Sequence, residues 1–171
     1  MVERLAMVAA AQDGVLSSTD AARVGVTAVR LDGLVRAGEL VRVRRGAYVL
    51  RTVHEAADPE ARYSLRTKAV LRTRPKLDAA SHHAALLLAG IDTYAVDLGI
   101  VDLVSAVRAT RVRSGLRTHP SSGLGVEVVD GWSRVVAPIA LCQLAAASGV
   151  VATVCSSGAR SSCCRAPCGP A

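Results

Sequence analysis

Hydrophobic residues follow a helical period in the first part of the chain. Apolar side chains recur every three or four positions in residues 2–12, 18–24 and 27–37, and a glycine follows each stretch. Glycine commonly stops a helix, and Thr27 is a good N-cap for the third stretch, as Ser18 or Thr19 is for the second. Val15-Leu16 is a short extended piece. The pattern predicts three short helices, with one short strand between the first and the second.

The period changes to two at residues 41–50, where apolar and basic residues alternate around Arg45-Gly46. Alternation of this kind puts the valines on one face of a hairpin and sends Arg42 and Arg44 to the other, while Gly46 supplies the positive φ of a tight turn. Three helices followed by such a hairpin, or wing, have the order of a winged helix-turn-helix. In that arrangement the third helix enters a major groove and the wing lies over the adjoining backbone or minor groove.

The rest of the chain mixes both periods. Asp58-Pro59-Glu60 begins a predicted helix that runs to about Arg74, and further helices are predicted from Ser81 to Gly90 and from Pro138 onward. Strands are predicted at 77–80, 100–104, 116–119, 126–129 and 132–136, the last two as a hairpin about Asp130-Gly131. The sequence therefore predicts an α+β protein, with an N-terminal winged helix-turn-helix domain at 1–55 and a small mixed α/β domain at 56–153.

Positive charge is concentrated in the first half of the chain. The formal net charge is +7, and residues 1–75 carry thirteen Lys or Arg against eight Asp or Glu, whereas residues 76–150 carry six of each. A basic surface attracts phosphate backbones, and arginine suits bidentate contacts to phosphate or guanine. A coding bias toward Ala, Val, Gly and Arg explains the same preference for arginine equally well. With four aromatic residues in the chain, single-strand binding by base stacking is not expected.

Eight residues of the third helix and the wing are predicted to contact double-stranded DNA. Arg30 is the best candidate for a base-edge contact, and Thr27 and Ala28 at the N-terminal end of the helix are placed to approach phosphate or a thymine methyl group. Phosphate contacts are predicted for Arg36, Arg42, Arg44 and Arg45. Tyr48 of the wing is also predicted to contact DNA. The alternative is that these arginines form only the solvated faces of a small helix and hairpin.

The sequence offers little for catalysis or metal binding. Consecutive helix residues point about 100° apart, so His82 and His83 are not expected to face one metal, and we expect one of them packed and the other solvated. Asp97 and Asp102 are not followed by a Lys, His or Glu at a spacing that would complete a nuclease site. Cys142 lies on an apolar helix, where a buried cysteine is expected. The predicted protein is not an enzyme and holds no metal or cofactor.

No apolar run approaches the roughly 20 residues that span a bilayer, and Glu3 and Arg4 stand where a signal peptide is apolar. The sequence thus predicts a cytoplasmic protein with no membrane contact. Residues 154–171 differ sharply from what precedes them, because they hold four of the five cysteines. A zinc site would need a second pair of ligands downstream, and a disulfide scaffold does not fit the cytoplasm. We expect an irregular Cys/Ser-rich tail that a frame shift or a truncation produced.

With these elements placed, the chain resembles the actinobacterial AbiEi-like antitoxins of type IV toxin–antitoxin systems. The likeness spans about residues 5–150 and depends on an ordered set of short segments: 25–27, 34–38, 42–50, 80–82, 88–90, 101–104, 129–138 and 144–145. One departure is that Asp32 and Gly33 stand in the third helix where relatives are usually more basic.

The resemblance implies a repressor that binds the promoter of its own operon through the winged helix. It also implies a second domain that opposes a nucleotidyltransferase-like toxin. Palindromic operators are commonly bound by dimers, so a homodimer on DNA is expected. The alternative is a truncated remnant of a winged-helix nuclease-like protein that acts only as a protein-interaction domain.

Overall fold

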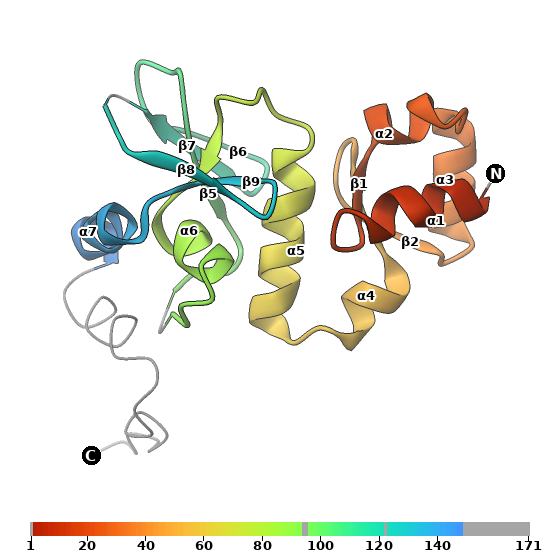
Figure 1. Ribbon diagram of the computed structural model, residues 1–171, viewed down its shortest axis with the longest axis horizontal. Coiled ribbons are helices and arrows are strands. Elements are labelled where there is room, and N and C mark those ends of the chain that lie inside the picture. The colour runs from red at the N-terminus through yellow and green to blue at the C-terminus, as the bar shows by residue number, and fades with distance from the viewer. Residues whose placement is uncertain (1, 94–95, 122, 149–171) are drawn as a thin grey trace, which may run out of the picture.

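A long helix stands between two β-sheets in the computed structural model, which describes residues 2–93, 96–121 and 123–148. This central helix, α5 (Pro59–Leu71), packs on both sides. Figure 1 shows the N-terminal elements on one side of α5 and the larger sheet with its two helices on the other.

The N-terminal elements have the predicted winged-helix order. They are α1 (Val2–Ala10), β1 (Val15–Ser17), α2 (Ser18–Arg23), α3 (Ala28–Arg36), β2 (Leu40–Arg44) and β3 (Ala47–Leu50). The strands form an antiparallel sheet in the order β1-β3-β2, and Arg45-Gly46 makes the two-residue turn of the wing, with Gly46 at φ 77°. The helices close over this sheet around one core, made by Leu5, Leu16, Leu31, Leu34, Leu40 and Tyr48 with smaller residues between them.

Local capping explains where the short helices begin. Thr27 caps α3 as predicted, because its Oγ1 accepts a hydrogen bond from the Arg30 amide at 3.3 Å. The predicted cap of α2, Ser18 or Thr19, was wrong. Ser17 is the cap: its Oγ accepts from the Asp20 amide at 3.1 Å, and the Asp20 carboxylate accepts from the Ser17 amide at 2.9 Å. This reciprocal pair fixes the helix start directly after β1.

Two differences from the prediction lie around α5. A short helix, α4 (Arg51–Ala56), directly follows the wing and was not predicted. The helix α5 begins at Pro59 with Asp58 as its cap, as predicted, but it ends at Leu71 and not near Arg74. Its inner face joins residues from both sheets in a buried cluster, which contains Val15, Ala47, Val49, Leu65, Ala69 and Trp132.

The second sheet has six strands in the order β6-β7-β5-β4-β9-β8. The strands are β4 (Ala79–Ala80), β5 (Val101–Ser105), β6 (Arg111–Arg113), β7 (Leu116–Pro120), β8 (Val126–Val129) and β9 (Trp132–Val135), and β5 is parallel to β7 while β4 is parallel to β9. The hairpin at Asp130-Gly131 is confirmed, since both residues have positive φ. β6 was not predicted because all three of its residues are exposed.

Two helices complete this part of the molecule. They are α6 (His82–Leu88) and α7 (Ala137–Ser148), which pack against one another beside the sheet (Figure 1). The predicted boundaries at residues 55 and 153 stay a prediction, and the predicted tail lies outside the described residues. Among the described residues, no helix has the length and apolar character that crossing a membrane requires.

Candidate nucleic-acid interface

The first turn of α3 is uncovered. Thr27, Ala28 and Arg30 are all exposed, as a groove-reading helix requires, while Leu31 and Leu34 are buried. Val29 lies among the uncovered residues and is 77% exposed. The sequence analysis did not include Val29, although its position relative to Leu31 and Leu34 would have placed it on the outer face. An exposed apolar side chain here is suited to contact a thymine methyl group.

The wing is tied to α3 through Arg42. The guanidinium of Arg42 forms an ion pair with the Asp32 carboxylate of α3, and it lies over the Tyr48 ring at 5.6 Å from the centroid. Arg36 is exposed on the same helix, where its Nε donates to the Asp32 carbonyl at 3.3 Å. Asp32 therefore joins helix and wing, and it also neutralises part of their charge.

Tyr48 does not lie on the surface. It is 5% exposed and belongs to the N-terminal core, so the prediction that it contacts DNA directly does not agree with its position. Alternation along β3 explains this, because Tyr48 faces the helices that cover the sheet. Its effect on a bound duplex would be indirect, through the stacked guanidinium of Arg42.

The turn of the wing faces the second sheet across a basic cleft of about 1180 Å³. Five arginines line this cleft: Arg44 and Arg45 of the wing, Arg74 after α5, and Arg111 and Arg113 of β6. No carboxylate is among the residues that line it in the described part of the chain. Burial lowers the pKa of Arg44, and the nearby charges of Arg74 and Arg113 lower it further. Like charges held this close together favour an anionic ligand.

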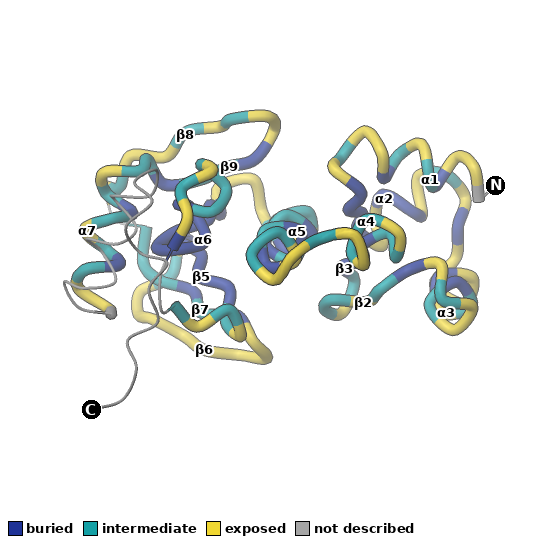
Figure 2. Tube along the Cα trace, turned by 90° about the horizontal axis from the view of Figure 1, so that it is seen from below, coloured by how far each residue is buried: buried dark blue, intermediate teal, exposed yellow. Residues whose placement is uncertain are grey.

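The helix, the wing and the cleft lie along the same edge of the molecule. Figure 2 shows α3, the β2–β3 hairpin and β6 in sequence along that edge, while α1 lies on the opposite one. Arg44 is half-buried and Arg45 is exposed, so the wing tip borders the cleft without being closed off by the second sheet. Seven of the eight predicted residues are thus exposed or half-buried on α3, its N-cap and the wing, and Tyr48 is buried.

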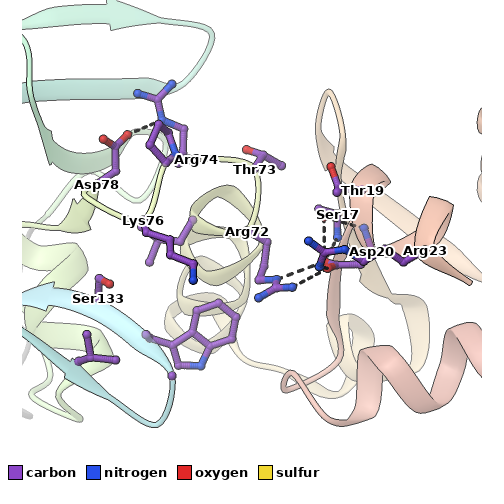
Figure 3. Close-up of a pocket in the computed structure, with 15 residues that line it drawn as sticks. Ser17, Thr19, Asp20, Arg23, Arg72, Thr73, Arg74, Lys76, Asp78 and Ser133 are labelled. Carbon is purple, nitrogen blue, oxygen red and sulfur yellow. Dashed lines mark hydrogen bonds and ion pairs between the residues drawn. The ribbon is translucent and has the colours of Figure 1, made fainter.

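A second cavity, of about 900 Å³, separates α2 from the end of α5 and β9 (Figure 3). Asp20 is 3% exposed at its edge and accepts hydrogen bonds from Arg72, one of them from Nε at 3.2 Å. On the other side Arg74 Nε lies 2.6 Å from the buried carboxylate of Asp78. These ion pairs hold α5 and its following turn in place, and the cavity carries no set of groups that indicates catalysis.

The burial of the adjacent histidines His82 and His83 differs from the prediction. Both are buried, with His82 8% and His83 6% exposed, so the expectation of one packed and one solvated was wrong. His82 has φ 53°, outside the helical range, and the angle expected between consecutive helix residues therefore does not apply. His83 Nδ1 lies 3.7 Å from Asp102 Oδ2, and burial is the main reason that the pKa of His82 falls to about 4.

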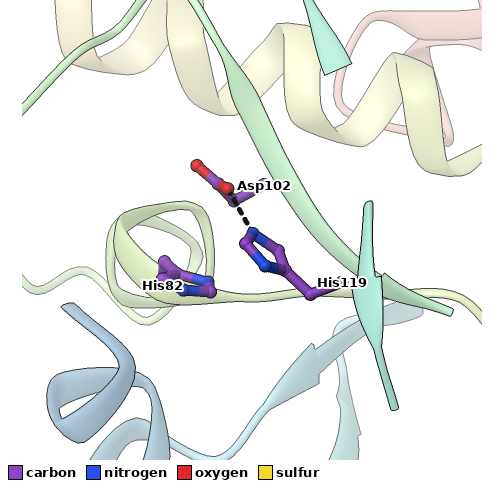
Figure 4. A group of neighbouring side chains, drawn as sticks. All are labelled: His82, Asp102 and His119. Atoms are coloured by element: carbon purple, nitrogen blue, oxygen red, sulfur yellow. Dashed lines mark hydrogen bonds and ion pairs between the residues drawn. The ribbon is translucent and has the colours of Figure 1, made fainter. Parts of the chain in front are cut away.

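His119 is the residue of this region that the sequence analysis missed. Its Nε2 lies 2.7 Å from Asp102 Oδ1, and its ring stacks on His82 at 4.2 Å between centroids (Figure 4). The parallel register of β5 and β7, with Val104 opposite His119, brings these side chains together across the sheet. That register depends on long-range pairing, which local spacing does not reveal. Cys142, expected to be buried, is exposed.

The fold and its surface define a winged helix-turn-helix protein of mixed α+β class. Residues 3–51, which run from the second residue of α1 through β3 to the first residue of α4, match a family described as transcriptional regulators, AbiEi antitoxin. The predicted resemblance to AbiEi-like antitoxins is confirmed over this range, and the family is one of regulators. No curated protein matches the chain.

Proposed function

We propose that this protein is a DNA-binding transcriptional regulator of the AbiEi antitoxin type, which represses its own operon and opposes a nucleotidyltransferase-like toxin. The observation that carries the proposal is the connection of α3 to the wing through Asp32 and Arg42, with uncovered polar and basic side chains on both. The family match over residues 3–51 supports it.

In this proposal α3 enters the major groove by its N-terminal half. Arg30 contacts a base edge, Thr27 and Ala28 lie against the groove wall, and Val29 adds an apolar contact. The phosphate contacts come from exposed or half-buried arginines of the helix and wing: Arg36, Arg42, Arg44 and Arg45. Such contacts orient the protein and contribute affinity that is the same for all sequences.

The basic cleft extends this surface beyond the winged helix. Arg111 and Arg113 lie on an edge strand of the second sheet, and both are exposed. A duplex lying along α3 and the wing would bring its next phosphates over β6, where those arginines meet Arg45 across the cleft. The second unit would therefore contribute to affinity without reading sequence.

Three further parts of the proposal concern organisation and partners. The natural ligand is the promoter of the protein's own operon, the toxin contacts the unit at 56–153, and two copies bind one palindromic operator. Half-sites would then be one helical turn or a multiple of it apart, about 10 base pairs between centres. The boundary near residue 55 separates the winged-helix unit, which reads the DNA sequence, from the unit that opposes the toxin.

Binding to a duplex from the protein's own upstream region tests the proposal, with a scrambled duplex of equal length for comparison. Replacing both Arg44 and Arg45 by Ala should weaken binding to both duplexes to a similar extent. Arg30→Ala should instead reduce the preference for the upstream duplex by roughly 5- to 150-fold, the loss of about 1–3 kcal/mol of base readout.

Arg4→Ala is the matched control, because Arg4 is exposed and belongs to α1, which lies at the opposite edge of the molecule (Figure 2). It should bind like the wild-type protein. The proposal would be contradicted if the protein does not change the gel mobility of either duplex at low salt. Equal affinity of the wild-type protein and the variant with Ala at both Arg44 and Arg45 would also contradict it. Co-purification of a neighbouring gene product without DNA binding would favour the protein-interaction alternative.

A further inference from the structure

A His-Asp-His cluster lies in the second unit, with His82 and Asp102 buried and His119 half-buried. It consists of His82 at the start of α6, Asp102 on β5 and His119 on β7, and one potential ligand atom from each lies within 4.8 Å of the others. We propose that this cluster binds a divalent transition-metal ion of the zinc type. The proposal does not depend on the DNA-binding function.

The spacing of the ligand atoms is close to what a bound ion needs. Nitrogen and oxygen ligands stand about 2.0–2.2 Å from zinc, so neighbouring ligand atoms in a tetrahedral site are roughly 3.4 Å apart. His119 Nε2 and Asp102 Oδ1 are 2.7 Å apart in a hydrogen bond, and a bound ion would widen this distance by about 0.7 Å. His82 is already stacked beside His119, with an angle of 28° between the rings. Binding of one ion by all three residues would require the His82 ring to turn from this stacked position, so that its Nε2 faces the ion beside His119 Nε2.

The outer nitrogens of both histidines have hydroxyl neighbours. His82 Nδ1 lies 3.1 Å from Ser81 Oγ, and His119 Nδ1 lies 3.5 Å from Thr110 Oγ1. Metal-binding histidines usually hydrogen-bond through the nitrogen that does not bind the ion, which fixes the ring and its tautomer. In both rings this pattern leaves Nε2 as the ligand atom.

The backbone at His82 is held in a conformation that a histidine rarely adopts. Its φ of 53° is in the left-handed region, and its amide donates to Gln143 Oε1 of α7 at 3.1 Å. Strain of this kind persists when the surroundings impose it, and it is concentrated at functional sites. Here the strained residue is the one whose ring stacks on His119 of β7.

The space and the charges around the His-Asp-His cluster determine which metal ion it would bind. His82 and Asp102 also line a cavity of about 200 Å³, which leaves room for a water molecule as a further ligand. Asp102 is 2% exposed and supplies the negative charge, while Arg117 Nε lies 3.6 Å from its Oδ1. The arginine charge opposes a second cation, so it should limit the affinity. This set of two imidazoles and one carboxylate suits zinc better than calcium or magnesium.

Titration with Zn²⁺ and Co²⁺ tests the proposal on the full chain. Free thiols would bind these ions themselves, so the protein should carry serine at the exposed Cys142 and at Cys155, Cys163, Cys164 and Cys168. It should first be freed of metal with a chelator. Calorimetry should show one ion per chain with micromolar or tighter affinity. The visible absorption of bound Co²⁺ should report nitrogen and oxygen ligands without thiolate.

Matched variants separate an ion site from a purely structural network. His119→Gln and His82→Gln should each weaken binding at least tenfold, His54→Gln outside the cluster should leave it unchanged, and Arg117→Gln should tighten it about tenfold. No saturable binding by the serine background, or binding that survives both cluster variants, would overturn the proposal. Should His119→Gln fail to fold, the Arg117→Gln result decides, since unchanged or weaker binding there contradicts an ion at Asp102.

Discussion

Single carboxylates hold the short helices of this protein to one another. Asp20 is the clearest case, because it caps α2 through Ser17 and receives hydrogen bonds from Arg72 of the segment after α5. Burial alone would raise its pKa, but the hydrogen bonds from Arg72 and Ser17 outweigh burial and lower it. The folded state therefore favours the charged carboxylate.

Asp20→Asn should lower the free energy of unfolding by about 2–3 kcal/mol at neutral pH, since a buried ion pair and a capping box are lost together. A lowered folded-state pKa gives stability above the unfolded value of about 3.9, and this stability disappears as the pH falls through the folded value. Urea unfolding at pH values from 7 to 3 should thus show that the difference in free energy of unfolding between wild type and Asp20→Asn becomes smaller as the pH falls. Asp92 is exposed, so Asp92→Asn should change the free energy of unfolding by less than about 0.5 kcal/mol. A difference for Asp20→Asn that stays constant with pH would contradict a charged, ion-paired Asp20.

At the scale of elements, the sequence predicted correctly several helix caps and turns that form through interactions between near neighbours in the chain. The caps made by Thr27 and Asp58, and the turn at Asp130-Gly131, each depend on an interaction between residues fewer than four positions apart in the chain. They were predictable for that reason. The strand β6 has no buried residue to mark it, and α4 lacks a side-chain cap. His119 reaches Asp102 only through the pairing of β5 with β7. Contacts of that kind follow from the whole fold, and a pattern along the chain does not contain them.

Two glycines of the winged helix should respond to substitution in opposite directions. Gly33 is in the middle of α3, and a Cβ there would meet nothing within 4 Å, so Gly33→Ala should stabilise the protein by about 0.5–1 kcal/mol. Gly46 has φ 77°, and a Cβ would lie 3.2 Å from Ser18 Oγ, so Gly46→Ala should destabilise it by about 1–2 kcal/mol. Chemical unfolding of the two variants gives both values. A neutral Gly46→Ala would show that the wing does not turn at Arg45-Gly46 as described.

At the scale of the whole molecule, packing fixes the wing relative to the second sheet. Trp132 of β9 lies in the buried cluster with Leu65 and Val49, and its indole Nε1 donates to Asp13 at 2.9 Å. Lys68 of α5 donates to the same carboxylate at 2.9 Å. Residues from both sheets therefore meet on α5, and the cleft between wing and β6 keeps a defined width. We therefore propose that α3, the wing and β6 form one surface for a duplex.

The salt dependence of duplex binding tests this claim most directly. Each phosphate contact contributes about 0.9 to the slope of log affinity against log salt concentration. The slope should fall by roughly 1–2 when Arg44 and Arg45 are both replaced by Ala, and by a similar amount when Arg111 and Arg113 are, while Arg4→Ala leaves it unchanged. If the slope is the same in all four proteins, α3, the wing and β6 do not form a common surface for DNA.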